Sequence, residues 1–142
     1  MENYTRPVEA LLDALYGAYN EHRPAEAAAL YRPDGRHVEI AQGNERSGRE
    51  AIREGLERFF EAFPDARWET RERIVAGNLA AVTYLLTGSL QGRLGPFEPS
   101  GQRLELRGVH VFRTVDGLIE VCEDYWDSGT FGRQMREEGG ER

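Results

Sequence analysis

Hydrophobic residues recur every three or four positions in the first part of the chain, which predicts helices there. Residues 7–19 are predicted to form an amphipathic helix, with Pro7 in the first turn, where a missing backbone N–H has little effect. The apolar stripe of this helix consists of Val8, Leu11, Leu12, Leu15 and Tyr19. A short alanine-rich helix is predicted over residues 25–31, followed by a turn over residues 32–35 and a short strand over residues 37–41.

A third helix is predicted to begin at Ser47–Glu50, which has the spacing of a capping box. In that motif the Ser47 hydroxyl and the Glu50 carboxylate accept hydrogen bonds from free backbone N–H groups. An apolar stripe follows, and Pro64 ends the helix. The stripe consists of Ile52, Leu56, Phe59, Phe60 and Phe63. A phenylalanine stripe at this spacing indicates core packing rather than a cofactor site.

After Pro64 the hydrophobic period changes to about two, which predicts strands. Four strands are expected, over residues 67–75, 79–90, 103–113 and 118–127. Gly77–Asn78 and Asp116–Gly117 are expected to form hairpin turns, residues 92–101 a longer loop, and residues 130–137 a small helix. Because helices come first and consecutive strands afterwards, we predict an α+β fold with an antiparallel, strongly bent sheet.

The length and charge of the chain narrow the classes of function. A chain of 142 residues suits one domain, which we predict over residues 1–138, with a disordered tail over residues 139–142. The 25 acidic residues outnumber the 18 basic residues, and the net charge of −7 leaves no basic excess for binding nucleic acid. Every basic residue is arginine, which excludes Schiff-base chemistry on a lysine.

The cysteine and histidine content argues against metals and disulfides. Cys122 is the single cysteine, which excludes an intramolecular disulfide and a cysteine-based zinc site. The three histidines have neither HxxxH nor HxH spacing, so no metal site is expected. The polar N-terminus lacks an apolar signal region, and no apolar run approaches the ~20 residues that span a bilayer. We therefore expect a cytoplasmic protein without a membrane partner.

The last two predicted strands carry the residues best suited to chemistry, His110 and Asp124. If residues 115–117 form a three-residue loop, His110 opposes Cys122, and His110 and Asp124 then project from the same face of the sheet. A loop of two or four residues would place them on opposite faces, because a one-residue slip inverts the pattern. We expect the three-residue loop, since Asp-Gly suits its last two positions.

The surroundings of Asp124 determine its strength as a base. Walls formed by Leu106, Phe112 and Trp126 would remove water from the carboxylate and raise its pKa, which suits removal of a proton next to a carbonyl. A protonated His110 would lower the pKa again, so the residues alone leave the protonation of the pair open. The same two residues also fit a buried pair that only holds strand register.

Four stretches of the chain carry a family resemblance. They are Phe-Glu-Ala-Phe-Pro-Asp-Ala-Arg-Trp at 60–68, Pro-Ser-Gly at 99–101 leading into Leu-Arg-Gly-Val-His-Val-Phe at 106–112, Asp-Gly-Leu-Ile at 116–119, and Glu-Asp-Tyr-Trp-Asp at 123–127 with Arg-Gln-Met at 133–135. Tyr19–Asn20 and residues 29–34 extend the pattern into the helical half. Together they resemble the SnoaL-like polyketide cyclase branch of the nuclear transport factor 2-like superfamily.

The resemblance implies a cone, in which three helices pack into the concave side of a curved sheet and leave an apolar pocket. By similarity, Asp124 acts as acid and base in an intramolecular aldol ring closure, and His110 hydrogen-bonds the substrate or the enolate oxygen. No metal or organic cofactor is implied. The cyclases often carry His-Trp-Asp where this chain has Cys122-Glu123-Asp124, so the substrate contacts of that histidine and tryptophan are not carried over.

Residues 123–127 are also similar to the limonene-epoxide hydrolase branch, in which an Asp–Arg–Asp relay activates water. Asp124 matches one aspartate of that relay. The strand that would supply the other two members, residues 82–87, holds no charged residue. Epoxide hydrolysis is therefore the less favoured alternative.

Further residues are expected to bind the substrate in the pocket. They are Trp126, Phe112, Leu106, Cys122, Tyr16, His37 and Glu39. His37 and Glu39 alternate on a short strand where relatives place polar pocket residues, and a solvated edge strand explains them equally well. Tyr16 offers a hydroxyl if it points into the cone, although such tyrosines more often pack helices. Tyr84 is expected either to line the pocket or to pack, and Cys122 to behave as a small hydrophobic residue.

Two functions remain open at this point. The first is a cofactor-independent enzyme that moves a proton on a hydrophobic carbonyl compound, and the second is a non-catalytic small-molecule binding protein of the same fold. An enzyme requires Asp124 to face a cavity that reaches solvent, whereas a binding protein can keep it inaccessible. The outer face of the sheet is expected to form a homodimer, as in relatives. That face is predicted to present Val109, Val111, Ile119 and Val121.

Overall fold

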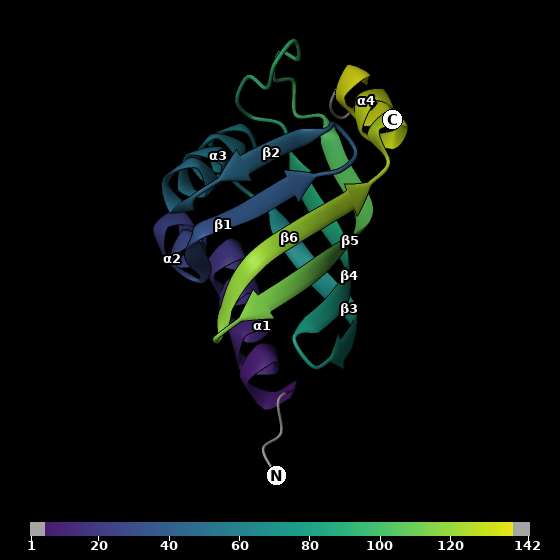
Figure 1. Cartoon of the computed structure of the whole chain (residues 1–142). Coiled ribbons are helices and arrows are strands. Elements are labelled where there is room, and N and C mark those ends of the chain that lie inside the picture. The colour runs from purple at the N-terminus through teal and green to yellow at the C-terminus, as the bar shows by residue number, and fades with distance from the viewer. Residues whose placement is uncertain (1–4, 138–142) are drawn as a thin grey trace.

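A curved six-stranded sheet in the order β2-β1-β6-β5-β4-β3 forms the framework of the protein (Figure 1). The computed structural model describes residues 5–137. The strands are β1 (Tyr31–Glu39), β2 (Asn44–Ser47), β3 (Arg67–Ala76), β4 (Leu79–Ser89), β5 (Arg103–Val115) and β6 (Leu118–Trp126). The helices are α1 (Thr5–Asn20), α2 (Pro24–Ala29), α3 (Arg49–Ala62) and α4 (Ser128–Arg136). The first three helices pack on the concave side of the sheet, which confirms the predicted α+β fold.

The first two strands differ from the prediction. Residues 32–35, predicted as a turn, lie inside β1, where the pairing with β6 shifts register between Tyr31 and Arg36. Tyr31, predicted to end the second helix, begins this strand, and β2 was not predicted at all. The sheet is also mixed rather than purely antiparallel, because β1 runs parallel to β6. This arrangement is possible because a long stretch of chain separates the two strands, whereas a short hairpin would force them to be antiparallel.

Helix α3 forms as predicted but without the capping box. Gly48 precedes the helix with a φ of 90°, and no side chain caps the first turn. Ser47 ends β2, and its hydroxyl donates instead to Glu45 across 3.1 Å. The carboxylate of Glu50 accepts a hydrogen bond from Arg53 on the next turn. The spacing therefore marked the start of the helix correctly, while both side chains have other partners.

The turn between β5 and β6 contains two residues rather than the predicted three. Asp116 and Gly117 have φ values of 53° and 78°, and Val115 pairs with Leu118, as in a two-residue hairpin turn. The register then shifts so that one extra residue, Glu120, bulges from β6. The bulge adds the residue that the short turn lacks. From Val121 onward, the side chains of β6 therefore point to the faces that the three-residue turn predicted.

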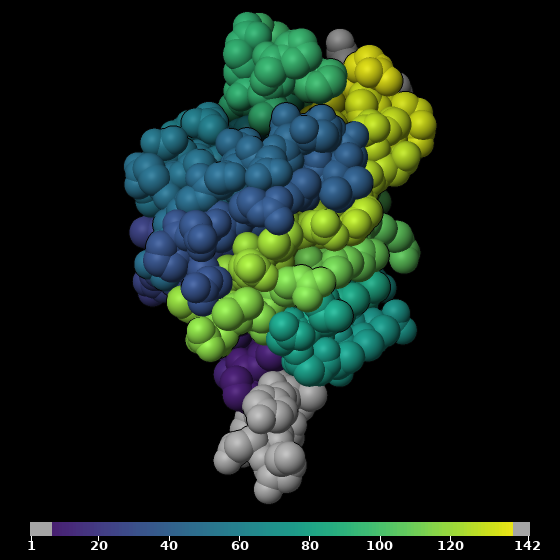
Figure 2. Space-filling view, viewed as in Figure 1, coloured from purple at the N-terminus to yellow at the C-terminus, as the bar shows by residue number. Residues whose placement is uncertain are grey.

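The bulge also changes the outer face of the sheet. Ile119, expected on that face, is fully buried in the core, because it lies on the turn side of the extra residue. Val109, Val111 and Val121 are half-buried, and Tyr125 is 40% exposed. Figure 2 shows strands β1, β6, β5 and β4 lying side by side across this face with no helix over them.

The core lies between the concave face of the sheet and the helices. Its most deeply buried members include Leu12, Leu15, Tyr31, Phe63, Leu104 and Phe112. The loop between β4 and β5 projects beside α4 (Figures 1 and 2), and Gln102 joins the two by donating to the carbonyl of Met135 across 2.9 Å. Among residues 5–137, no helix is long and apolar enough to cross a membrane. The predicted disordered tail over residues 139–142 falls outside the described part of the chain.

Candidate functional site

Three polar residues from distant parts of the sequence form one row across the sheet. Glu39 on β1 is the pairing partner of Asp124 on β6, and Asp124 in turn lies directly opposite His110 on β5. Residues directly opposite each other on neighbouring strands point to the same face. The predicted placement of His110 and Asp124 on one face is therefore confirmed, although the predicted three-residue turn was wrong.

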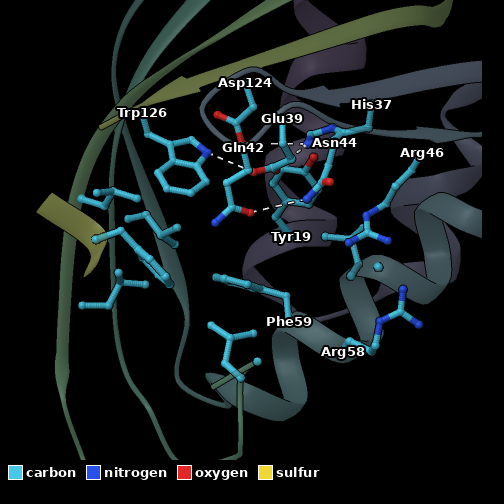
Figure 3. Close-up of a pocket in the computed structure, with 18 of the residues that line it drawn as sticks. Tyr19, His37, Glu39, Gln42, Asn44, Arg46, Arg58, Phe59, Asp124 and Trp126 are labelled. Carbon is cyan, nitrogen blue, oxygen red and sulfur yellow. Dashed lines mark hydrogen bonds and ion pairs between the residues drawn. The ribbon is translucent and has the colours of Figure 1, made fainter. Parts of the chain in front are cut away.

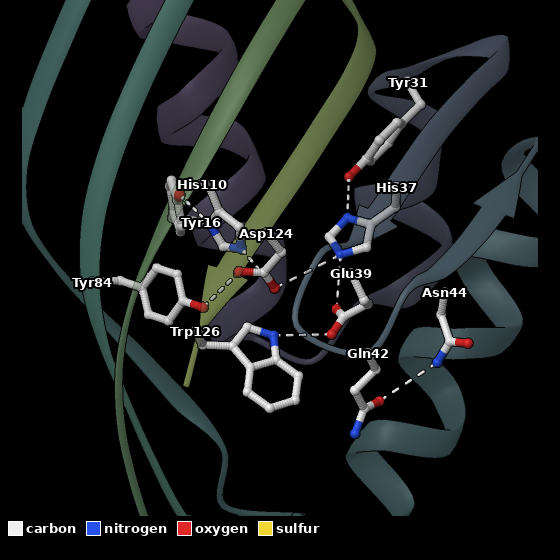
Figure 4. A network of polar contacts seen from close by, with 10 residues as sticks. All are labelled: Tyr16, Tyr31, His37, Glu39, Gln42, Asn44, Tyr84, His110, Asp124 and Trp126. Carbon is white, nitrogen blue, oxygen red and sulfur yellow. Dashed lines mark hydrogen bonds and ion pairs between the residues drawn. The ribbon is translucent and has the colours of Figure 1, made fainter. Parts of the chain in front are cut away.

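The two oxygens of Asp124 have different partners (Figure 4). The Tyr84 hydroxyl donates to Oδ1 across 2.6 Å. Oδ2 lies 3.4 Å from Nε2 of His110 and 3.8 Å from Nε2 of His37. One oxygen is thus held by a phenol, while the other faces two imidazole rings that can exchange a proton with it.

Gly108 makes the contact between Tyr84 and Asp124 possible. A Cβ atom at position 108 would lie 2.2 Å from the Tyr84 hydroxyl oxygen, so any other residue there would displace the ring. Tyr84 and Gly108 are direct partners on β4 and β5. A glycine in the middle of a long strand is the signal that could have identified Tyr84 as a site residue, since it marks a close approach.

Tyrosine hydroxyls orient both histidines. Nδ1 of His110 shares a hydrogen bond of 2.7 Å with Tyr16, and Nδ1 of His37 shares one of 3.1 Å with Tyr31. Each ring therefore turns its Nε2 atom toward Asp124. This second set of contacts fixes which nitrogen of each ring takes part in any proton transfer.

The network continues from His37 to a tryptophan. Nε2 of His37 lies 3.1 Å from one carboxylate oxygen of Glu39, and the other oxygen accepts a hydrogen bond of 3.0 Å from the indole N–H of Trp126. In the described part of the chain, no buried side-chain nitrogen or oxygen lacks a hydrogen-bond partner. The arrangement is preorganised, because each group is held by a neighbour.

The pKa of Asp124 is lowered, contrary to the effect expected from apolar walls alone. Burial raises the pKa, but His110, His37 and the hydrogen bond from Tyr84 lower it to about 2. The neighbouring positive charge and hydrogen bonds outweigh the loss of water around the carboxylate. Asp124 is therefore ionised at neutral pH.

The pKa of His37 is shifted in the opposite direction. Burial lowers it, whereas Cys122, Glu39 and Asp124 raise it to well above its ordinary value. Burial also raises the pKa of the Cys122 thiol, so this group stays neutral, and the two carboxylates are the anions that hold the proton on His37. The site thus combines a carboxylate that can accept a proton with an imidazolium that can donate one.

The row of polar residues forms one wall of a cavity of about 540 Å³ (Figure 3). Asp124 is 8% exposed and lines this cavity, so it neither points into bulk water nor is sealed in the core. Of the expected pocket residues, Trp126, Leu106, His37 and Glu39 line the cavity together with His110. Apolar side chains from α3 and the sheet also line it, among them Leu56, Phe59, Leu86 and Leu104.

Three residues expected to touch the substrate lie behind the cavity wall. Phe112 and Cys122 are fully buried in the core, and Tyr16 packs against His110 from α1. None of the three lines the cavity. Strand alternation placed Phe112 and Cys122 on the correct face, but it does not show how far along that face the helices cover the sheet. Tyr16 follows the alternative that such tyrosines pack helices.

His37, Glu39 and Asp124 are also the residues that could hold a metal ion. Their ligand atoms lie within 4.8 Å of one another, which the spacing of histidines in the sequence did not reveal. The proton on Nε2 of His37 already lies between the carboxylates of Glu39 and Asp124, so a cation could bind there only by displacing this proton.

Comparisons with known proteins agree on the fold. The sequence profile of the SnoaL-like domain family matches residues 12–121. A candidate polyketide cyclase from Xanthomonas campestris pv. campestris superimposes with a TM-score of 0.81 at 22% identity, covering 94% of this chain and 99% of the other. A candidate SnoaL-like polyketide cyclase from Jannaschia sp. CCS1 gives 0.79 at 22% identity, covering 92% of each chain.

A third structure carries a different functional description. A candidate hydroxylase from Streptomyces galilaeus superimposes with a TM-score of 0.81 at 22% identity, covering 94% of this chain and 86% of the other. No curated protein sequence matches the chain at a significant level. Structures this similar at such low identity show the nuclear transport factor 2-like fold and leave the reaction to be argued from the site.

Proposed function

Because this chain belongs to the SnoaL-like domain family, we propose that it is a small cytoplasmic enzyme that needs no cofactor and moves a proton on a hydrophobic carbonyl compound. The reaction class is aldol cyclisation or isomerisation. One observation carries the proposal: the carboxylate of Asp124 lies on the wall of a largely apolar cavity, and its Oδ2 atom faces the Nε2 atoms of His110 and His37.

In the proposed reaction, Oδ2 of Asp124 removes a proton from the carbon next to the carbonyl, and an enolate forms. The N–H of an imidazole, on His110 or His37, stabilises the charge on the enolate oxygen. In ring closure the enolate carbon attacks a second carbonyl carbon, and the resulting alkoxide recovers the proton from Asp124. In isomerisation the proton returns to a different carbon, so no atom is gained or lost in either case.

The low pKa of the free carboxylate is compatible with this role. An apolar guest that covers Asp124 removes water from it, and desolvation favours the protonated form. Substrate binding thus strengthens the base at the moment when it is needed. The tyrosine on Oδ1 leaves Oδ2 as the oxygen that accepts the proton.

The proposal is tested by following exchange of the α-protons of phenylacetone, a small hydrophobic ketone, into D2O by NMR. The wild-type protein is expected to accelerate exchange, and Asp124→Asn to reduce the catalysed rate by about 10²–10⁴-fold, the usual contribution of a general base. Glu123→Gln is the matched control, because Glu123 is the adjacent residue and bonds Tyr125 on the other face. An unchanged rate in Asp124→Asn would remove Asp124 from the mechanism.

A non-catalytic binding protein remains the second candidate, and the complete pairing of the buried polar groups favours it. In that case phenylacetone would bind without any accelerated exchange, and Asp124→Asn would alter only affinity. Epoxide hydrolysis is not proposed, because β4 supplies Tyr84 and Leu86 to the cavity rather than the arginine and aspartate of that relay.

A further inference from the structure

The cavity has a second polar region, formed by two arginines on the side away from Asp124. Arg46 on β2 and Arg58 on α3 line the cavity, and Figure 3 shows their guanidinium groups on the same side of it, beside α3. Arg46 is the direct partner of His37 in the β1–β2 pair, so strand geometry directs both side chains to the cavity face.

Among residues 5–137, these two arginines have no hydrogen-bond or ion-pair partner. Neither makes a hydrogen bond or ion pair with any residue that the structure describes, whereas Arg93, the third arginine of the cavity, is paired with Glu98. Nearby arginines on β1 and α3 are also paired, Arg36 with Glu45 and Arg53 with Glu50. Arg46 is half-buried and Arg58 is exposed, so the two guanidinium groups at the cavity have donors that no described side chain uses, although acidic side chains are abundant in this chain.

The side chain of Arg46 packs against Gly55 of helix α3. A Cβ atom at Gly55 would lie 2.4 Å from Nε of Arg46 and 2.7 Å from Cζ, so the guanidinium group lies directly on the helix backbone. Glycine inside a helix is less favourable than alanine, so a glycine here needs a reason. Its presence here allows the side chain of Arg46 to lie along the cavity instead of being pushed away from it.

From these observations we propose that the cavity binds substrates that carry an anionic oxygen group at the end remote from the reacting carbonyl, and that Arg46 and Arg58 bind this group. Guanidinium groups match the paired oxygens of carboxylates and phosphates, and apolar side chains between the two polar ends suit a hydrocarbon body. The inference rests on the proposed function, because it names the substrate class of the same cavity. Its test uses binding alone, so it can fail independently of the catalytic role of Asp124.

The test compares two fluorescent probes of the same aromatic shape, 8-anilinonaphthalene-1-sulfonate and the neutral N-phenyl-1-naphthylamine. The double variant Arg46→Gln/Arg58→Gln is expected to weaken binding of the sulfonate by about 100-fold, roughly tenfold for each arginine, and to leave the neutral probe within about twofold. Gly55→Ala is expected to weaken only the sulfonate, because the new methyl group displaces Arg46.

Arg36→Gln is the matched control, since Arg36 lies on the same hairpin and pairs with Glu45 outside the cavity. It should leave both probes unchanged, and Asp124→Asn should retain sulfonate binding even if it abolishes proton exchange. Displacement of the sulfonate by 2-naphthoate indicates a carboxylate substrate, and displacement by 2-naphthyl phosphate indicates a phosphate ester. Equal weakening of both probes in the double variant, no weakening of either, or failure of both competitors would overturn the proposal.

Discussion

At the scale of single residues, the chemistry of the site follows from the unequal surroundings of one carboxylate. Oδ1 of Asp124 accepts a hydrogen bond from Tyr84, while Oδ2 faces two histidines whose other nitrogens are held by tyrosines. A carboxylate arranged in this way has one oxygen that is fixed and one that can accept a proton. The identity of the accepting oxygen is therefore a property of the folded protein rather than of the substrate.

Removing the Tyr84 hydroxyl should raise the pKa of Asp124. The hydrogen bond from Tyr84 stabilises the ionised form, so Tyr84→Phe removes one of the contacts that lower this pKa. The measurement is a carbon-13 NMR titration of the side-chain carboxyl groups, with Asp124 assigned by comparison with Asp124→Asn. Tyr125→Phe is the control, because that hydroxyl bonds Glu123 at the surface and should leave the titration of Asp124 unchanged. A pKa that stays the same or falls in Tyr84→Phe would contradict the assignment.

The lowered pKa also predicts how stability depends on acid. Asp124 has a folded-state pKa of about 2 against an ordinary value of 3.8, so the ionised form stabilises the fold above pH 4. This stabilisation is lost as the pH falls through the folded-state value, and it amounts to about 2 kcal/mol. Urea unfolding of wild type and Asp124→Asn at pH 5 and pH 2 measures it. The difference between the two proteins should shrink by about that amount at the lower pH, and a constant difference would show that Asp124 has an ordinary pKa.

At the scale of elements, the predictable parts of the structure are those with strong apolar alternation or a clear helical stripe. Strands β3 to β6 and helices α1 and α3 belong to this group, and their bounds agree with the prediction within a few residues. Strand β2 was missed because it is short, polar and at the sheet edge, and β1 was interrupted in the prediction because Pro33 and Gly35 resemble a turn. β1 and β2 carry His37, Glu39 and Arg46, so the polar part of the cavity was only partly visible in the sequence.

The hairpin between β5 and β6 shows why register is hard to predict from a turn alone. The two-residue turn by itself would have placed His110 and Asp124 on opposite faces. The bulge at Glu120 reverses that outcome, and nothing in the local sequence distinguishes a bulge from regular pairing. The prediction for His110 and Asp124 was therefore correct only because the shorter turn and the bulge, neither of which was predicted, cancel each other.

Two glycines on different elements are expected to respond in opposite ways to the same substitution. Gly108→Ala places a methyl group against the Tyr84 hydroxyl and should destabilise the protein by about 1–3 kcal/mol, as other overpacking changes do. Gly17→Ala, within α1, meets no atom within 4 Å and should stabilise the protein by about 0.5–1 kcal/mol. Thermal unfolding of both variants measures the difference. A neutral Gly108→Ala would mean that Tyr84 can bond Asp124 without the space that the glycine provides.

At the scale of the whole molecule, the curvature of the sheet separates two surfaces with different roles. The concave side holds the helices, the core and the cavity, whereas the outer side has no helix over it (Figure 2). Two proteins that share the fold with this chain at 22% identity have names that describe different activities. Differences in function are therefore expected in the side chains of the cavity, and differences in assembly on the outer face.

The outer face is expected to join two copies of the chain. Val109, Val111 and Val121 form a half-buried apolar strip there, and Tyr125 adds an exposed aromatic ring. A second copy related by a two-fold axis would cover the same strip on both molecules, which is the commonest arrangement in soluble oligomers. Sedimentation at micromolar concentration should therefore give a dimer for the wild-type protein. Val111→Arg should give a monomer, because its long charged side chain, which can pair with Glu123 opposite it on β6, would occupy the surface that the second copy has to cover.

Ile74→Arg provides the control for this prediction. Ile74 is a large hydrophobic residue that is 68% exposed, but it lies on the edge strand β3, away from the strip. If the outer face forms the dimer, a charge at position 74 should leave the dimer intact, whereas loss of the dimer in both variants would place the contact elsewhere. A wild-type monomer would show that the valine strip is tolerated in water. In that case the outer face has no role in assembly, and the cavity with its carboxylate would have to function within a single chain.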